Sequence, residues 1–556
     1  MNKKVCSFPI LFALLTLLIG TCAVVFPASA QAAPTSTGSI TVSGTVASRY
    51  DAYQIFSANV VDGDSDAKIA TDLAWASDAV RDAALPVLHS AGMPNSQTTA
   101  QEAAEWLNAD SHLTSALSAQ LARSLQSSGA ESVALNAGTA AELSCGYWLI
   151  VADDDAIAQG EAGTAPIMAL VGGGAVTVKP KAATPKVAKH VLEDSTAAWQ
   201  KAADATVADD LYWRLSATVP AGLAAYDTYT VQFVDTMSAG LDPSKVAASM
   251  HVYVAAGADG GFDAVSAGKD GRAGTEPAKG WTDITAQCAT KVAADGKTFT
   301  VRTGDLIAAL GGADAFAAGA RVVAVYNAPL NSACNHGIAK GNPNEVYLRY
   351  PRSPFADQSG EAGFTRTPSD DACAYTWDLA LTKRGSDGDK PLAGAVLSIA
   401  DDRGRTLAAD GTWDAEGKAT VTTGEDGRVT VSGVDSGKLE VRELKAPKGY
   451  TAFEGIRSVT VKAEGLDVDQ VAAAKPKLTI TAESPLRADS ADGSTGSLEA
   501  SIINTPTGTP PSITTGGFMP STGDMAMYAA AAAAVAGAAL IVVALLVKRG
   551  GGSHKE

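Results

Sequence analysis

Positive charge and aromatic side chains are both scarce in this sequence. Of its 556 residues, 43 are Lys or Arg and 60 are Asp or Glu, so the formal net charge is -17, and aromatic residues make up 6%. A nucleic-acid-binding protein needs clustered basic residues for phosphate contacts, so we expect no nucleic-acid partner. Hydrophobic residues nevertheless make up 46%, which excludes a wholly disordered chain. The length exceeds one ordinary hydrophobic core and predicts several domains.

Metal-binding and catalytic patterns are also missing. Six histidines are spread over the chain, and neither a His-x-x-x-His pair nor a Cys-x-x-Cys pair occurs. We therefore expect no metal site and no cofactor. The sequence also lacks a convincing Ser-His-Asp or paired-carboxylate arrangement, so we predict that the protein is not an enzyme such as a secreted hydrolase.

The N-terminal segment has the features of a secretory signal peptide. Lys3 and Lys4 precede an apolar run over residues 10–26, and Ala28-Ser29-Ala30 supplies the small residues that signal peptidase requires. We predict that residues 1–30 are a signal peptide cleaved after Ala30. The mature chain is therefore expected outside the cell.

The other end combines a pentapeptide, an apolar segment and a basic tail. Residues 525–547 are long and apolar enough to span a bilayer, and the basic tail, 548–556, is expected to stay in the cytoplasm. A plain single-pass anchor is one interpretation. The order of the three parts also closely resembles the cell-wall sorting signal of Gram-positive surface proteins, usually Leu-Pro-x-Thr-Gly. The pentapeptide here is Met519, Pro520, Ser521, Thr522 and Gly523. The resemblance implies that a sortase attacks the Thr522 carbonyl and anchors the chain to the cell wall.

The chain between these ends is predicted to be mainly β, as tandem immunoglobulin-like sandwiches. Residues 34–178 show strand patterns on both sides of an Ala-rich, Leu-spaced stretch, 69–125, which predicts an N-terminal domain with a helical insertion. Short β-type runs separated by Gly, Asp and Pro predict two further sandwich domains, residues 187–354 and 376–506. Residues 179–186 have the composition of a linker, and residues 507–518 that of a stalk rich in Pro, Thr and Gly.

Two lysines share a strand face with apolar residues. Lys189 is in phase with Val187 and Val191, because side chains two residues apart point to the same side of a strand. Lys383 is in phase with Leu379 in the same way. A buried ammonium group is costly, and without a partner it loses its proton. The simpler interpretation is a lysine at a strand end that extends to water, and for either lysine alone this interpretation is favoured.

A carboxyl and an amide in the same phase accompany each lysine. In the third domain these are Glu443 and Asn504, and in the second they are Asp235 and Asn344, with Asn342 as the weaker alternative. A neutral amine is a nucleophile, and a protonated carboxyl can donate to the amide oxygen. Held together in a dry core, the three groups could react with loss of ammonia. This pattern predicts two Lys-Asn isopeptide bonds, Lys189 to Asn344 and Lys383 to Asn504, assisted by Asp235 and Glu443.

These motifs resemble those of sortase-assembled pilins. The third domain looks like a Cna-B type domain, and the run from Glu443 to Tyr450 resembles the pilin E-box, with Leu444 where Thr is usual. The run from Val176 to Lys181 resembles the pilin motif, with Lys179 in place of Tyr. The resemblance implies a shaft subunit of a cell-surface pilus. A sortase would join Thr522 of one subunit to Lys181 of the next, and the neighbouring linker lysines remain alternatives.

The resemblance also implies the partners. They are pilus-type and housekeeping sortases, identical subunits in a covalent polymer, accessory pilins, cell-wall peptidoglycan, and a host or bacterial receptor that the sequence does not identify. The alternative function is a basal or accessory pilin, or a wall-anchored adhesin, that is not polymerised. In that case Thr522 serves for attachment and Lys181 is unused.

Two further expectations concern lysine and cysteine. The N-terminal domain has one lysine, Lys68, in sequence that reads as helical, so we expect no internal isopeptide bond there. Four cysteines follow the signal peptide: Cys145, Cys288, Cys334 and Cys373. They allow three disulfide connectivities, and Cys288 with Cys334, inside one domain, is the favoured pair.

Overall fold

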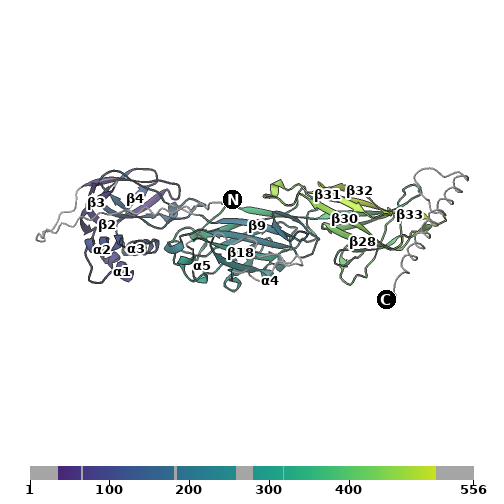
Figure 1. Ribbon diagram of the computed structural model, residues 1–556, viewed down its shortest axis with the longest axis horizontal. Coiled ribbons are helices and arrows are strands. Elements are labelled where there is room, and N and C mark those ends of the chain that lie inside the picture. The colour runs from purple at the N-terminus through teal and green to yellow at the C-terminus, as the bar shows by residue number, and fades with distance from the viewer. Residues whose placement is uncertain are drawn as a thin grey trace, which may run out of the picture.

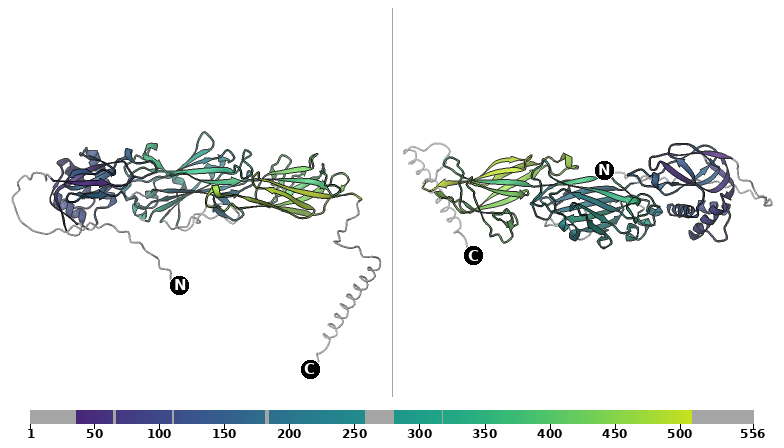
Figure 2. Two further views of the ribbon diagram at one scale, coloured as in Figure 1. Left: turned by 90° about the horizontal axis from the view of Figure 1, so that it is seen from above. Right: turned by 180° about the vertical axis from the view of Figure 1, so that it is seen from behind.

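The computed structural model describes residues 36–63, 67–109, 111–180, 184–257, 280–316 and 318–508. The predicted signal peptide, sorting pentapeptide, membrane span and cytoplasmic tail lie outside the described residues, and so does Lys181. Within these ranges, no helix has both the length and the apolar character needed to cross a bilayer. The structure is mainly β, and three sheet-containing units follow one another along its long axis in chain order (Figures 1 and 2). The predicted fold class is confirmed.

The first unit consists of two sheets and three helices. One sheet has the order β5-β1-β8, and the other has the order β3-β2-β6-β7, with β4 beside β2. The helices gather on one side of these strands (Figure 1). The elements are β1 Thr37–Val42, β2 Arg49–Asp62, β3 Lys68–Trp75, α1 Asp78–Ser90, α2 Ala100–Asn108, α3 Ser115–Ser128, β4 Val133–Asn136, β5 Ala141–Ser144, β6 Gly146–Ala152, β7 Ile167–Val171 and β8 Val176–Val178.

The helical insertion is confirmed, and each of its helices begins at a hydroxyl cap. In α2, Thr99 accepts a hydrogen bond from the Glu102 N–H, and Glu102 accepts one from the Thr99 N–H, which satisfies two otherwise free backbone donors. Ser77 and Thr114 cap the other two helices. The expectation of helix around Lys68 is wrong: Lys68 begins β3, which pairs with the long strand β2. Pairing with β2 satisfies the backbone of this segment in place of helical hydrogen bonds.

The second unit is a sandwich of two sheets. Their strand orders are β10-β9-β12-β18-β14-β15 and β11-β21-β19-β13-β17-β16, with β20 beside β19. The elements are β9 Lys186–Glu193, β10 Ala198–Gln200, β11 Ala202–Asp204, β12 Tyr212–Val219, β13 Gln232–Met237, α4 Val246–Ser249, β14 His251–Ala256, β15 Thr282–Asp283, β16 Ala289–Val292, β17 Thr298–Arg302, α5 Leu306–Ala309, β18 Ala320–Asn327, β19 Asn342–Pro351, β20 Phe364–Arg366 and β21 Asp370–Tyr375. Because β20 and β21 pair with β19, this sandwich continues beyond residue 354, the predicted end of the second domain.

The third unit is also a sandwich. One sheet has the order β27-β22-β33-β29, with β32 beside β33, and the other has the order β25-β24-β23-β28-β30-β31, with β26 beside β23. Its first strand, β22, and its last, β33, are parallel neighbours. The elements are β22 Trp377–Gly385, β23 Val396–Ala400, β24 Thr406–Leu407, β25 Trp413–Asp414, β26 Val421–Thr422, β27 Arg428–Val434, β28 Gly437–Lys445, β29 Tyr450–Thr451, β30 Ile456–Glu464, β31 Lys477–Ala482, β32 Leu486–Asp492 and β33 Ser497–Pro506.

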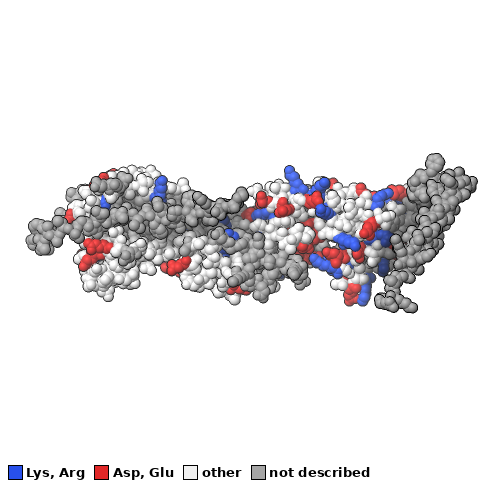
Figure 3. Space-filling model, viewed as in Figure 1, with Lys and Arg blue, Asp and Glu red and all other residues white. Residues whose placement is uncertain are grey.

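Charged side chains are distributed unevenly on the face shown in Figure 3. Lys and Arg are interspersed with Asp and Glu over the third unit, whereas the first unit shows few basic side chains there. The two buried lysines of the predicted sites lie inside the sandwiches, and both side chains are 0% exposed.

Candidate functional site

The site in the third domain is built from three strands. Lys383 lies near the end of β22, where Leu379, Leu381 and Lys383 all face the core. Asn504 lies on the neighbouring strand β33, in which Ile502 is the direct partner of Lys383. Glu443 comes from β28, a strand of the facing sheet. The strand period therefore directs all three side chains into the space between the sheets.

The three side chains form a closed set of contacts. The Lys383 Nζ donates a hydrogen bond to the Asn504 Oδ1 and lies 3.0 Å from the Glu443 Oε1. The Asn504 Nδ2 donates to the same Glu443 oxygen at 2.8 Å. The other carboxyl oxygen of Glu443 accepts from the Phe453 N–H at 3.0 Å. One carboxyl oxygen thus contacts both the amine and the amide nitrogen.

Burial favours the reactive form of the amine. Desolvation lowers the pKa of Lys383 from 10.5 to about 8, although the charge of Glu443 opposes this shift. The Phe453 ring, whose centroid is 5.4 Å from Nζ, contributes to the apolar surroundings. A substantial fraction of the amine is therefore neutral near pH 8, with its nitrogen beside the amide that it would attack.

The site in the second domain crosses between the two sheets. Lys189 lies on β9 of one sheet, whereas Asp235 on β13 and Asn344 on β19 belong to the facing sheet. All three side chains are 0% exposed. The structure therefore brings together the lysine, carboxyl and amide predicted for this domain.

The contacts of this site differ from those of the third domain. The Lys189 Nζ forms an ion pair with the Asp235 Oδ2 and donates to the Tyr326 hydroxyl at 2.9 Å. The Asn344 Nδ2 also donates to the Tyr326 hydroxyl, at 2.8 Å, and that hydroxyl donates to the Asp235 Oδ2 at 3.1 Å. The phenol thus lies between the amine and the amide.

Burial acts on both ionisable partners. Desolvation lowers the pKa of Lys189 to about 8, against the attraction of Asp235. Desolvation also raises the pKa of Asp235 above its usual value, and the nearby lysine opposes that change. Both shifts move the pair toward its neutral form, an amine and a protonated carboxyl.

Sequence reasoning missed Tyr326. Its position on β18 is in phase with Val322 and Ala324, which are both buried. A tyrosine in such a run is typical of an ordinary core residue. The available signal was a phenol facing the same core as an inward lysine, since a buried hydroxyl requires a partner.

Asn342, the weaker candidate, has a structural role. Its Nδ2 donates to the Asn335 and Ala374 carbonyls at 2.9 and 3.2 Å, and its Oδ1 accepts from the Asn335 N–H at 2.8 Å. The side chain holds the loop that precedes β19.

In the first domain, Lys68 contacts backbone oxygens and a carboxylate. Its Nζ donates to the Gly172 and Gly174 carbonyls at 2.5 and 3.0 Å and to Asp62 at 3.1 Å. Lys68 therefore fixes the turn between β7 and β8.

The predicted disulfide between Cys288 and Cys334 is not formed, and all four cysteines of the described chain are free. Cys288 directly precedes β16. The first residue of β16 pairs with Arg302 of β17, and Arg302 pairs in turn with Gln232 at the start of β13. Cys334 packs against Gly240, beyond the other end of β13. Cys288 and Cys334 are therefore separated by the length of β13, a six-residue strand that rises about 3.3 Å per residue. A disulfide needs Cα atoms within about 7 Å.

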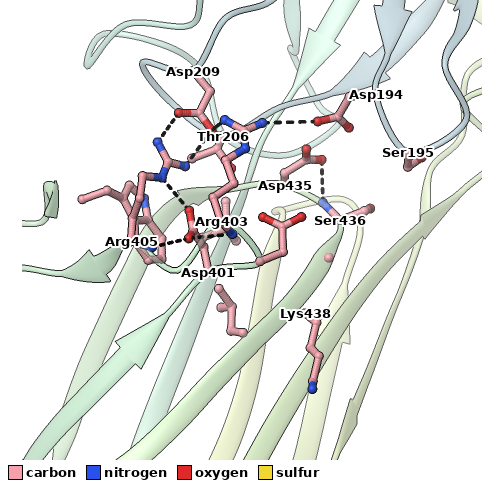
Figure 4. Close-up of a pocket in the computed structure, with 15 residues that line it drawn as sticks. Asp194, Ser195, Thr206, Asp209, Asp401, Arg403, Arg405, Asp435, Ser436 and Lys438 are labelled. Carbon is pink, nitrogen blue, oxygen red and sulfur yellow. Dashed lines mark hydrogen bonds and ion pairs between the residues drawn. The ribbon is translucent and has the colours of Figure 1, made fainter. Parts of the chain in front are cut away.

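A pocket lies where the second and third domains meet, and two arginines in its lining, Arg403 and Arg405, form ion pairs with carboxylates of the same lining (Figure 4). Asp209, between β11 and β12, accepts from Arg405 at 2.5 and 2.8 Å and from Arg403 at 2.8 Å. Both arginines belong to the turn between β23 and β24. Asp204 accepts from the Trp377 Nε1 at 2.6 Å and the Ser436 N–H at 2.9 Å. These contacts join the two domains.

Comparison with known families identifies the third domain. A family model described as the SpaA prealbumin-like fold domain matches residues 378–475. A stretch of 134 residues is 30% identical to the trypsin-resistant surface T6 protein of Streptococcus pyogenes serotype M6. The match covers 23% of this chain and 23% of that protein. Residues 378–475, within the domain predicted to be of Cna-B type, therefore match a prealbumin-like fold.

Solved structures with a similar arrangement include two pilins. The T6 backbone pilin of Streptococcus pyogenes is 16% identical, with a TM-score of 0.45, over 85% of this chain and 98% of that chain. The major pilin SpaD of Corynebacterium diphtheriae is 15% identical, with a TM-score of 0.40, over 85% of this chain and 98% of that chain.

Proposed function

We propose that this chain is a structural subunit of a covalently polymerised cell-surface pilus. The observation that carries the proposal is the closed contact among Lys383, Glu443 and Asn504 in the third domain, of which residues 378–475 match the SpaA prealbumin-like model. All three side chains are buried, so a substrate or ligand in solution does not reach them. Their value is in a cross-link that holds a domain closed under load.

The cross-link in each domain forms by transamidation. The lone pair of the lysine Nζ attacks the amide carbon of the asparagine, and a bond from Nζ to that carbon forms. The bond from the carbon to Nδ2 breaks, and Nδ2 leaves as ammonia with one proton that originated on Nζ. In the third domain, Glu443 contacts both nitrogens and is placed to move that proton.

We propose that polymerisation joins Lys181 of one subunit to Thr522 of another, and both residues lie outside the described ranges. In the sequence, Lys181 comes three residues after the end of β8 at Val178 and five residues before the start of β9 at Lys186. Its neighbour Lys179 is exposed. A sortase would form the acyl bond at Thr522 and transfer it to the Lys181 amine of the next subunit, with the last subunit transferred to peptidoglycan. Accessory pilins and a receptor complete the set of proposed partners.

One preparation tests both parts of the proposal. Surface material released from whole cells by a wall hydrolase is run on a denaturing gel and then digested for peptide mass spectrometry. We expect a high-mass ladder that disappears in Lys181→Ala and persists in the matched variant Lys186→Ala. A single discrete band in the wild type would contradict polymerisation and support an anchored adhesin.

The same digest reports the internal bonds. We expect two branched peptides, one joining Lys189 to Asn344 and one joining Lys383 to Asn504, each lighter by one ammonia than its two parts. Glu443→Ala should remove only the second branch, whereas Glu499→Ala, an exposed glutamate on β33, should leave both. Linear peptides alone from the wild-type chain would overturn the cross-linking proposal.

A further inference from the structure

The Tyr326 hydroxyl contacts every group of the second-domain site. It receives hydrogen bonds from the Lys189 Nζ at 2.9 Å and from the Asn344 Nδ2 at 2.8 Å, and it donates to the Asp235 Oδ2 at 3.1 Å. The side chain is 0% exposed. The Phe299 ring packs edge-on against it with a centroid distance of 4.8 Å, which fixes the ring in place.

The third domain shows what this phenol replaces. There, a single oxygen of Glu443 contacts both nitrogens that must exchange a proton, at 3.0 and 2.8 Å. Aspartate is one methylene shorter than glutamate. Asp235 contacts Lys189, while the hydrogen bond of the Asn344 Nδ2 goes to Tyr326. In the second domain the bridge between the two nitrogens is therefore the phenol oxygen.

We propose that Tyr326 is a catalytic residue that relays a proton from the Lys189 Nζ to the Asn344 Nδ2 during isopeptide formation. This inference rests on the proposed function, because it assigns a role within that cross-linking reaction. The step begins with a neutral amine and a protonated Asp235. Nζ forms a bond to the amide carbon of Asn344, and the carbonyl electron pair moves to Oδ1.

The relay then completes the exchange. One Nζ proton passes to the phenol oxygen while the phenol proton passes to Nδ2. The electron pair on Oδ1 re-forms the carbonyl, the bond from carbon to Nδ2 breaks, and ammonia leaves. Tyr326 and Asp235 end in the protonation states in which they began, so atoms and charge balance.

Two buried oxygens support this division of roles. The Asp235 Oδ1 and the Asn344 Oδ1 are both buried without a hydrogen-bond partner among the described residues. A proton on Asp235 would satisfy such a group and stabilise the negative charge that develops on the amide oxygen. Asp235 then acts on the oxygen of the amide, and Tyr326 acts on its nitrogen.

The test uses Tyr326→Phe in the full chain, which removes only the hydroxyl oxygen. The chain is made by cell-free synthesis, samples are quenched in denaturant at successive times, and branched peptides are quantified. General acid–base catalysis contributes roughly 100-fold or more, so we expect the Lys189–Asn344 branch to form roughly 100-fold more slowly. The Lys383–Asn504 branch should form at the wild-type rate. The matched control is Tyr350→Phe, a buried phenol on β19 that bonds the Gly160 carbonyl at 2.8 Å.

The possible outcomes distinguish failure of the Tyr326 proton relay from failure of the proposed Lys189–Asn344 cross-link. If the wild type shows no Lys189–Asn344 branch, the proposed cross-link itself fails. If the wild type forms the branch and Tyr326→Phe forms it equally fast, the relay is overturned. Hydrogen exchange of the β12 and β18 amides reports folding of the second domain, and loss of their protection in Tyr326→Phe would assign the phenol a structural role and also overturn the relay.

A second variant tests the reach of the carboxyl. In the double variant Tyr326→Phe with Asp235→Glu, the longer side chain can take the position that Glu443 has in the third domain. We expect faster branch formation than in Tyr326→Phe alone. If branch formation is no faster in the double variant while the β12 and β18 amides stay protected, the idea that the phenol substitutes for a longer carboxyl side chain is wrong.

Discussion

Lys189 and Lys383 are fully shielded from water, and that burial has two effects. It lowers the pKa of each amine to about 8, which supplies the nucleophile. It also makes the unreacted state costly, because a buried ion pair repays its desolvation poorly. Condensation converts the amine and the amide into one neutral amide. The reaction therefore relieves the cost that the fold imposes on the residues.

The pKa of Lys383 predicts how its cross-link depends on pH. The neutral amine is the reactive form, so the rate of Lys383–Asn504 formation should rise with pH through about 8 and then level off. The measurement is the branched peptide in chain synthesised and quenched at pH values on both sides of this point. A rate that falls as pH rises through about 8 would show that the neutral Lys383 amine is not the form that limits the reaction.

The same residue predicts stability in a variant that cannot react. In Asn504→Ala the amine stays free, and its pKa is lowered from 10.5 to about 8 in the folded state. Between pH values of about 8 and 10.5, Lys383 binds fewer protons in the folded state than in the unfolded state. The free energy of unfolding should therefore rise with pH over this range. Replacing Lys383 by Met in the same background should remove the trend.

Six of the seven residues in the two sites could be predicted from the sequence, because strand alternation fixes which side chains face the core. Lys383 and Asn504, for example, each follow an apolar residue at a spacing of two. Tyr326 could not, since a buried aromatic in an apolar strand has an ordinary packing role. Cys288 and Cys334 were wrongly paired because sharing a domain says nothing of the distance along β13 that separates them.

At the scale of elements, β22 and β33 show where a cross-link is most useful. They are the first and last strands of the third domain, and they lie side by side in parallel. Pulling on the two ends of the domain loads this strand pair directly. A covalent bond between Lys383 and Asn504 would carry that load in place of backbone hydrogen bonds, and it would constrain the unfolded chain as a disulfide does.

The turn that precedes β27 holds the end of β22 in place. The Lys383 N–H donates to the Gly427 carbonyl at 2.7 Å, and the Lys383 carbonyl accepts from the Leu392 N–H at 2.9 Å. Gly427 has a φ of 74°, and a Cβ there would lie 2.7 Å from the Leu392 nitrogen and 2.8 Å from the Lys383 oxygen. Only glycine fits this close approach.

Gly427→Ala should therefore disturb the Lys383 site as well as the backbone. The left-handed conformation alone costs roughly 1–2 kcal/mol, and the contact with Lys383 should add to it and slow formation of the Lys383–Asn504 branch. Gly411→Ala is the matched control, because Gly411 has a φ of 85° and nothing within 4 Å of the added Cβ. Thermal unfolding and the branched-peptide assay measure both effects. Equal behaviour of the two variants would show that the Gly427 contact is unimportant.

Element boundaries were less predictable than element types. Lys68 and its neighbours form β3 because β2 extends far enough to pair with them. β20 and β21 complete the second sandwich although their sequence gave no clear signal of a strand. Both cases depend on a partner strand that is distant in sequence, and a local pattern contains no information about that partner.

At the scale of the whole molecule, the units in a row (Figure 1) depend on the junctions between them. The contacts of Asp209 with Arg403 and Arg405 join the second and third domains. Beside these pairs lies a group of carboxyls that repel one another: Glu193, Asp194 and Asp204 from the second domain and Asp435 from the third. The junction is therefore stabilised by ion pairs and sensitive to protonation.

Glu193 is the carboxyl from which we predict the pH dependence of this junction. It is 3% exposed, and its Oε2 accepts from the Asp204 N–H at 3.1 Å. Burial, and then the charge of Asp204, raise its pKa from 4.5 to about 7, while hydrogen bonds from Ser195 and the Asp204 backbone oppose the shift. Between these pH values the folded state binds more protons than the unfolded state. Its contribution to stability therefore falls as pH rises from about 4.5 to about 7.

Glu193→Gln isolates this contribution, because the amide keeps the shape of the side chain and does not titrate. We expect the unfolding temperature of the wild type, relative to that of Glu193→Gln, to decrease as pH rises over the window and to stay constant above it. Calorimetric scans of the full chain at successive pH values measure the difference, with Glu345→Gln, an exposed glutamate on β19, as the matched control. A difference that increases with pH would mean that Glu193 is held as a carboxylate by the arginines across the junction. Repulsion among the neighbouring carboxyls would then not determine the stability of the junction between the second and third domains.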